Sequence, residues 1–121
     1  MRIYLAIILM VITSTAPAAS TYESKLTQSA LKGDYQSQRN LAYAYSVGSS
    51  LSNTASDDYV PQDSVKACAW RKVILLSQAK KADFSDYSNE SIDCQKVHAT
   101  DNQAVWSVVH KVVNVETKKT H

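Results

Sequence analysis

The segment Val65 to Leu76, VKACAWRKVILL, limits what this chain can fold into more than any other part of it. On a helix, its apolar side chains point in several directions instead of forming one stripe. A helix with this pattern is covered by neighbours on several sides. We therefore predict a central helix in a small helical stack. Lys66, Arg71 and Lys72 are expected to lay their stems over apolar surface and keep their charged groups in water.

The sequence before this segment predicts two further helices. Tyr22–Lys32 and Tyr35–Val47 are each followed by a glycine, Gly33 and Gly48, and these are the only two glycines in the chain. Glycine readily adopts the left-handed conformation that ends many helices. Asp63 is a favourable N-cap for the central helix. The scarcity of glycine also favours helices over an all-β fold, which uses more of it in turns.

The sequence after the central helix is harder to interpret, because residues 79–99 are mostly polar. A short helix from Ser88 to Val97 is predicted, and it would bring Cys94 near the central helix. Thr100 and Gln103 have the spacing of a capping box. Valine doublets four residues apart then predict a last helix with one broad apolar arc. We expect an all-α fold, a small antiparallel stack of about four helices.

The aromatic residues on these helices allow two interpretations. Trp70 and Trp106 are expected in the core, because large aromatic side chains dominate core packing. Tyr43 and Tyr45 are compatible with either the core or a binding face.

The N-terminus has the layout of a secretory signal peptide. Arg2 precedes an apolar run from Ile3 to Ile12, and a stretch of small residues with Ala18 follows. The run is shorter than the ~20 residues that a membrane-spanning helix needs. We predict a signal peptide over residues 1–19 and one domain over residues 20–121, without a membrane span and periplasmic or secreted. The alternative is a retained N-terminal anchor.

Charge and cysteine content narrow the possible functions. The net charge of the chain is +2, and the only basic cluster is KKTH at the C-terminus, so a nucleic-acid binder is not expected. Cys68 and Cys94 both lie in the part predicted to be exported, where an oxidising compartment favours one disulfide between them. Such a bond would stabilise the fold by roughly 3–4 kcal/mol. The alternative is two buried free thiols.

Two stretches of the chain resemble the Sel-one-like repeat, a relative of the tetratricopeptide repeat. That family pairs an A-Q-x-x-L-x-x-x-Y-x-x-G helix with a D-x-x-K-A-x-x-W helix. The matching residues are Gln38, Leu41, Tyr45 and Gly48 in SQRNLAYAYSVG, and Val60, Pro61, Asp63, Lys66, Ala67 and Trp70 in VPQDSVKACAW. The resemblance implies a tetratricopeptide-like αα-hairpin and a scaffold that binds another protein without chemistry of its own.

The resemblance covers about residues 28–79, and the chain departs from the family in two ways. The loop from Ser49 to Tyr59 is longer than the family's connector, and no second copy follows residue 80. Such units are normally stacked in threes or more, so a lone unit needs caps. The first helix, the last helix and the predicted disulfide are suited to that role.

Catalytic and metal-binding motifs were also considered. Cys94 and His98 stand at the spacing of two ligands on one helix face, and Cys68 with His110 would complete a four-ligand zinc site. However, no paired C-x-x-C or H-x-x-x-H motif is present, and a disulfide would consume both thiols. No cofactor, metal or catalytic residue is therefore assigned. A small periplasmic Cys/His metal-dependent enzyme is an alternative, as is an inhibitor or immunity-type protein that blocks a hydrolase.

We expect a non-catalytic protein–protein interaction module of the bacterial envelope. Arg39, Tyr43 and Val47 lie away from the core face of their helix, and arginine and tyrosine are enriched in binding hot spots. The adjacent loop carries Asp57 and Asp58 and is longer than a connection requires. These five residues are the predicted partner contacts.

Overall fold

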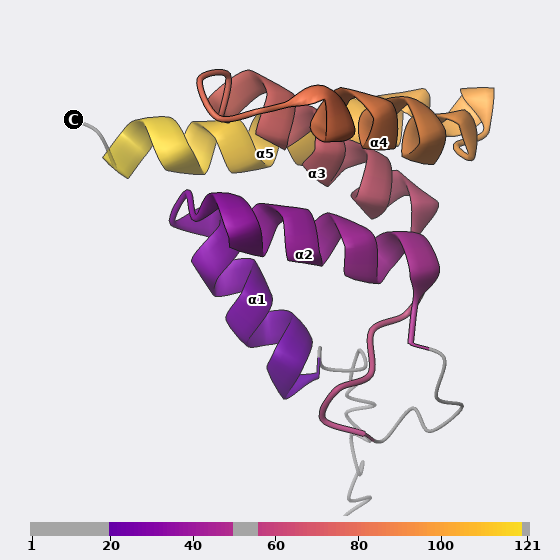
Figure 1. Ribbon diagram of the computed structural model, residues 1–121. Coiled ribbons are helices and arrows are strands. Elements are labelled where there is room, and N and C mark those ends of the chain that lie inside the picture. The colour runs from indigo at the N-terminus through magenta and orange to yellow at the C-terminus, as the bar shows by residue number, and fades with distance from the viewer. Residues whose placement is uncertain (1–19, 50–55, 120–121) are drawn as a thin grey trace, which may run out of the picture.

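The computed structural model describes residues 20–49 and 56–119, which form five α-helices and one short 3-10 helix (Figure 1). Their bounds are α1 Thr21–Leu31, α2 Tyr35–Val47, α3 Ser64–Ser77, α4 Phe84–Gln95, η1 Ala99–Asp101 and α5 Asn102–Lys119. No strand occurs in these two ranges, so the all-α prediction is confirmed, with one α-helix more than expected. The predicted signal peptide, residues 1–19, lies outside the described residues.

Helix α3 is the centre of the stack. It packs against α2, α4 and α5, whereas α1 packs mainly against α2 (Figure 1). Its buried apolar side chains are Ala67, Cys68, Ala69, Trp70, Val73 and Ile74. This confirms the central position predicted from the apolar pattern. None of the helices in the described ranges has the length and apolar character needed to cross a bilayer.

Arg71 differs from the prediction for the basic side chains of α3. Its guanidinium group is buried and lies 2.8 Å from a carboxylate oxygen of Asp93, which is also buried. The expectation that this head stays in water is wrong, because α4 supplies a negative charge directly above it. Leu76, the last residue of the apolar segment that is expected to be covered by neighbours, is exposed near the C-terminal end of α3.

The helix starts follow from side-chain caps. Each of helices α1 to α4 is preceded by an N-cap residue whose side-chain oxygen accepts a hydrogen bond from the backbone N–H three residues later. The four caps are, in order, Ser20, Asp34, Asp63 and Asp83. Asp83 and Asp86 form a reciprocal capping box, so α4 begins at Phe84, before the predicted Ser88. The capping box predicted for Thr100 is not formed. Thr100 lies within η1, where its hydroxyl is hydrogen-bonded to His98.

Helix α5 completes the core with Val105, Val109 and Val112, all buried. The predicted apolar arc is wider than the surface that contacts the core, so residues at its edges are exposed. Trp106 is 47% exposed, and the prediction that it is buried is wrong. Its ring lies on the flank of α5, 5.0 Å from the ammonium nitrogen of Lys72.

Candidate functional site

A groove beside the C-terminal half of α2 is the candidate functional site. It has a volume of about 240 Å³. Three parts of the chain form it: the start of α1, one face of α2, and the segment just before α3. The lining residues are Tyr22, Asn40, Tyr43, Ala44, Val47, Gly48, Ser49, Asp58 and Val60.

Backbone hydrogen bonds hold the walls of the groove together. The N–H of Tyr22 donates to the carbonyl of Asp57 at 3.0 Å, which ties α1 to the segment before α3. The N–H of Ser49 donates to the carbonyl of Val60 at 2.8 Å, and the Val60 N–H donates to the Ser49 hydroxyl at 2.7 Å. These bonds give the groove a defined shape, because they join all three of its parts.

Gly48 allows the chain to turn away from α2 at the floor of the groove. It has φ of +68°, and an added Cβ would lie 3.0 Å from the backbone nitrogen of Gln62. Both the positive φ and this close approach require glycine.

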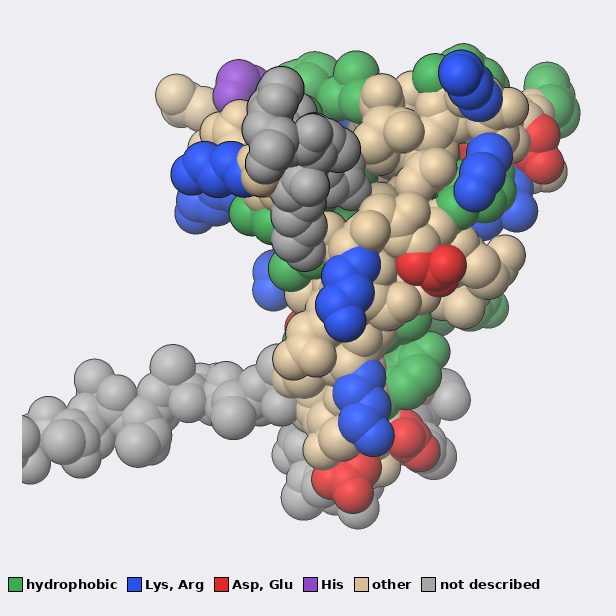
Figure 2. Space-filling view, turned by 90° about the vertical axis from the view of Figure 1, so that its left-hand side faces the viewer, with side chains coloured by type: hydrophobic (Ala, Val, Ile, Leu, Met, Phe, Trp, Pro, Cys, Tyr) green, Lys and Arg blue, Asp and Glu red, His purple; other side chains and the backbone are tan. Residues whose placement is uncertain are grey.

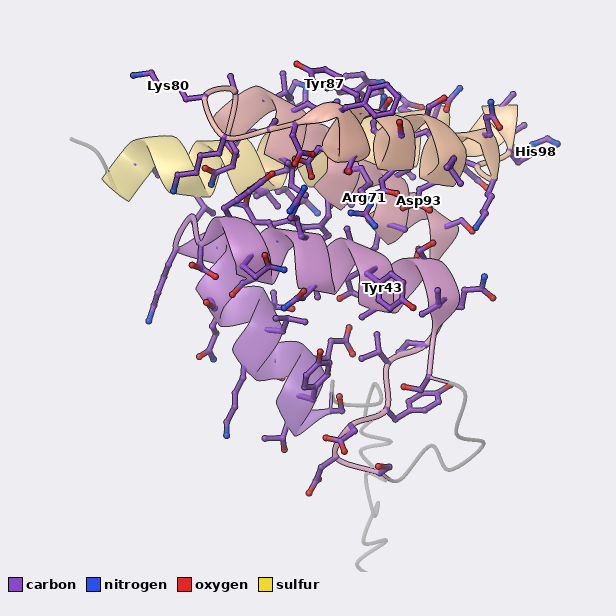
Figure 3. The ribbon with its side chains drawn as sticks, in the orientation of Figure 1. Tyr43, Arg71, Lys80, Tyr87, Asp93 and His98 are labelled. Carbon is purple, nitrogen blue, oxygen red and sulfur yellow. A yellow bond between two sulfur atoms is a disulfide. The ribbon has the colours of Figure 1, made fainter. Side chains whose placement is uncertain are left out.

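The groove exposes aromatic and apolar surface. Tyr22, Tyr43 and Val47 are 43%, 61% and 53% exposed. Tyr43 lies on the front of α2 in Figure 3, away from the core. Tyr45 is on the other side of the helix, buried, and its hydroxyl donates to Glu23 at 2.7 Å. Burial, followed by this hydrogen bond, raises the pKa of Tyr45. The two tyrosines therefore have different roles, with Tyr45 in the core and Tyr43 on the surface.

The rim of the groove carries negative charge. Asp57 and Asp58 are both exposed, and neither forms an ion pair with a residue in the described ranges. Asp58 lines the groove, whereas Asp57 contributes its backbone carbonyl to the bond with Tyr22. The rest of the predicted loop, residues 50–55, lies outside the described residues.

Arg39, a predicted partner contact, is held by carboxylates at the start of α4. Its guanidinium nitrogens lie 2.8 Å from Asp86 and 3.0 Å from Asp83, and its head stacks on the Tyr35 ring at 4.7 Å. The hydrogen bond to Asp86 raises the pKa of Arg39 further above its usual value. Arg39 thus joins α2 to α4. Its predicted contact with a partner stays a prediction.

The sulfur atoms of Cys68 and Cys94 form a disulfide, and their Cα atoms are 4.7 Å apart. This pairing agrees with the prediction. It leaves neither sulfur free as a zinc ligand or a nucleophile. Among the described residues, no group of three or more His, Cys, Asp or Glu side chains is arranged to hold a metal ion.

Searches against protein-family models, curated proteins and solved structures find no match to this chain. The site is therefore interpreted from its own geometry and chemistry.

Sequence reasoning found Tyr43, Val47 and Asp58 but missed the other residues that line the groove. Asn40 had a usable signal, because it lies three residues before Tyr43 and therefore on the same face of the helix. Tyr22 had none, because its place in the groove depends on a backbone bond to a residue far along the chain.

Proposed function

We propose that this chain is a non-catalytic protein-binding module of the bacterial envelope, and that its contact surface is the groove beside α2. The observation that supports this most is the gathering of Tyr22, Tyr43 and Val47, all exposed, in one groove. Monomeric proteins rarely expose such clusters without a use, and tyrosine is enriched in the hot spots of interfaces.

The chemistry of the groove defines the kind of partner. Tyrosine rings and a valine accept an apolar side chain, and the tyrosine hydroxyls can bond to a peptide backbone. The carboxylates of Asp57 and Asp58 at the rim, which form no ion pair within residues 20–49 and 56–119, favour a positive charge nearby. We propose a partner segment with an apolar anchor residue and an adjacent lysine or arginine.

The resemblance to the Sel-one-like repeat enters the proposal as the scaffold. Within the α2–α3 pair, five of the matching residues are buried: Gln38, Leu41, Tyr45, Ala67 and Trp70. Asp63 caps α3, and the ammonium group of Lys66 lies 5.2 Å from the Tyr45 ring. These roles support α2 and α3 as one αα-hairpin of the tetratricopeptide-like kind, with α1 and α5 as its caps.

The proposed location rests on two features. The disulfide is of a type that persists in oxidising compartments, and the N-terminal sequence has the pattern of an export signal. Both support a periplasmic or secreted protein.

The groove can be tested by site-specific capture of partners. A photo-crosslinking amino acid is placed at Val47, envelope proteins are crosslinked, and the partner segment is mapped by mass spectrometry. Its Kd is then measured with purified proteins for the wild type, for Tyr43→Ala and for Tyr87→Ala. Tyr87 is a matched control because it is 56% exposed but lies on α4.

The expected result is a loss of affinity of about tenfold or more for Tyr43→Ala, because a hot-spot residue contributes at least ~1.4 kcal/mol. Tyr87→Ala should bind like the wild type. Equal affinity for all three proteins would place the interface elsewhere and contradict the proposal.

A further inference from the structure

Helix α4 has the reverse of the usual amphipathic pattern, with charged residues on its buried face and apolar residues on its exposed face. Its inner face carries Asp86, Glu90, Asp93 and Cys94, and its outer face exposes large apolar side chains. Phe84, Tyr87 and Ile92 are 86%, 56% and 54% exposed, and Phe84 is the most exposed large apolar side chain among the described residues. Figure 3 shows Tyr87 at the outer edge of the molecule. We call this outer face of α4 the ridge.

The ridge carries no free negative charge. The acidic residues of the segment from 80 to 98 are Asp83, Asp86, Glu90 and Asp93. Each of them is paired with a cation of α2 or α3: Asp83 and Asp86 with Arg39, Glu90 with Lys72, and Asp93 with Arg71. Because Asp83 and Asp86 share Arg39, three cations meet these four acids, and the Asp83 side chain is 58% exposed. With Lys80, Lys81 and Lys96 the region holds six cations and four acids, a net charge of +2.

Positive charge stands at both ends of the ridge. Lys80 and Lys81 precede α4 and Lys96 follows it, all exposed and none in an ion pair within the described ranges. Lys81 is close enough to Asp34 to favour that carboxylate slightly. Lys80 extends away from the body of the protein in Figure 3. Figure 2 looks onto the left-hand side of the view in Figure 1, where lysine and arginine side chains are spread over the surface with several acidic ones among them, and hydrophobic side chains lie along the top edge.

We propose that the ridge is a docking surface for an anionic lipid bilayer. Aromatic side chains flanked by lysines, in a region of net positive charge, match the interfacial zone of a membrane, where aromatic rings sit at headgroup level and lysines meet lipid phosphates. The occupant is thus defined by charge complementarity. This surface is on another side of α2 from the groove, so the inference does not rest on the proposed protein-binding function.

The shape of the ridge favours a lipid surface over a protein. The ridge is the face of a single helix at the edge of the stack (Figure 1), so a protein would need a groove to fit it, whereas a bilayer deforms around it. The disulfide from Cys94 to Cys68 and the ion pairs to α2 and α3 hold the helix before binding. Little conformational entropy is then lost when the ridge meets the membrane.

The binding is expected to be reversible and sensitive to salt. Each lysine near an anionic surface strengthens binding about fivefold, and this attraction is screened within a Debye length. The test is sedimentation of the purified protein with vesicles of phosphatidylglycerol and phosphatidylcholine, at low and high salt. Vesicles of phosphatidylcholine alone are the lipid control.

Two variants of the ridge are compared with two matched controls. Lys80→Gln/Lys81→Gln removes two charges at the ridge, and Lys25→Gln/Lys32→Gln removes two exposed charges on α1. Phe84→Ser removes the most exposed aromatic ring among the described residues, and Val115→Ser removes an exposed apolar side chain of α5. All of these side chains are exposed, and circular dichroism checks that each variant keeps its helices.

The proposal expects binding to anionic vesicles that falls about 25-fold in Lys80→Gln/Lys81→Gln and at least about fivefold in Phe84→Ser. The α1 pair and Val115→Ser should bind like the wild type. The proposal is overturned if the wild type does not bind anionic vesicles at low salt, or if the α1 pair loses as much binding as the ridge pair. It is also overturned if only capture of an envelope protein, and not of vesicles, depends on Phe84, because the ridge would then be a protein contact.

Discussion

Helices α4 and α5 both pack against α3, but they do so by different means. Helix α5 contributes Val105, Val109 and Val112 to the apolar core. Helix α4 contributes carboxylates that meet cations of α2 and α3, and a cysteine bonded to α3. The first contact depends on apolar area and shape, whereas the second depends on charge state, redox state and the directions of individual bonds.

The polar contacts of α4 are not equal in their effect. The pair between Arg71 and Asp93 is buried on both sides, and Asp93 also accepts a hydrogen bond from Ser46 at 2.7 Å. The pair between Lys72 and Glu90 is partly exposed, where water weakens the attraction. Removing one contact at a time therefore tests how differently α4 and α5 are held to the rest of the fold.

The largest effect is expected from Asp93→Asn, which leaves the charge of Arg71 buried without a countercharge. Removing one partner of a buried ion pair typically costs about 3–5 kcal/mol of the free energy of unfolding. Urea denaturation measures this loss. Glu90→Gln is the matched control, with an expected loss below about 1 kcal/mol.

A double variant separates the cost of an orphaned charge from the value of the pair itself. In Arg71→Met/Asp93→Leu both charges are replaced by apolar groups, and we expect stability close to that of the wild type. A loss as large as that of Asp93→Asn would show that the ion pair itself stabilises the fold, and that the effect of Asp93→Asn is not only the penalty of burying an unpaired charge.

The next effect concerns the disulfide. Cys68→Ala/Cys94→Ala opens a loop with a sequence separation of 26 residues. On the chain-entropy model this lowers the free energy of unfolding by about 3.5 kcal/mol. Hydrogen exchange should show faster opening of α4 than of α5, because α5 keeps its valine contacts. Equal acceleration in both helices would mean that they unfold as one unit and would contradict the distinction drawn between them.

The corresponding test on α5 is Val109→Ala. This substitution removes two buried methyl groups and leaves a cavity. It should lower the free energy of unfolding by about 2–3 kcal/mol while the disulfide stays intact. Val115→Ala, at an exposed position of the same helix, should change stability by less than about 0.5 kcal/mol. If both variants lose the same stability, the arc of α5 is wider than its buried valines indicate.

The contrast between the two helices also explains what could be predicted from the sequence. Valine doublets at helical spacing identified α5, and the apolar belt of α3 identified the central helix. The predicted start of α4, Ser88, is four residues after the observed one. The residues of α4 that face the core are acidic, so its apolar residues mark the exposed face instead of the buried one. The partner of Arg71 lies 22 residues away along the chain, and no local pattern marks such a pair.

The candidate site divides in the same way. Tyr43 and Val47 were found because the helical wheel places them away from the core. Arg39 lies on the same stripe, but two carboxylates that reach it from α4 were not visible in the sequence pattern. A helical wheel shows which side chains point away from the core. It does not show which of them form ion pairs with other helices, because those pairs depend on how the helices pack.

The smallest effect is a pH dependence carried by the link between α2 and α4. Burial alone would raise the pKa of Asp86, but the hydrogen bonds from Arg39 and Tyr35 outweigh it and hold this pKa below its usual value of 3.8. The unfolded chain therefore binds a proton at a higher pH than the folded protein does. Stability from this group is present above pH ~4 and is lost as the pH falls through the lowered pKa.

Tyr35 adds an alkaline counterpart. Burial, followed by its hydrogen bond to Asp86, raises the pKa of Tyr35 to about 12 from 10.0. The unfolded chain loses this proton first, so stability is present below pH ~10 and is lost as the pH rises towards 12. Tyr35→Phe should flatten the alkaline limb of a plot of unfolding free energy against pH in part, because Tyr45 also has a raised pKa, and should leave most of the acid limb. Asp86→Asn should flatten the acid limb in part, because Asp34 also has a lowered pKa, owing to its hydrogen bonds from Ser37.

The valines of α5 carry no titratable group, so Val109→Ala should lower the whole curve without changing its shape. A change of shape in Val109→Ala, or an unchanged acid limb in Asp86→Asn, would show that the pH dependence does not arise at the α2–α4 link.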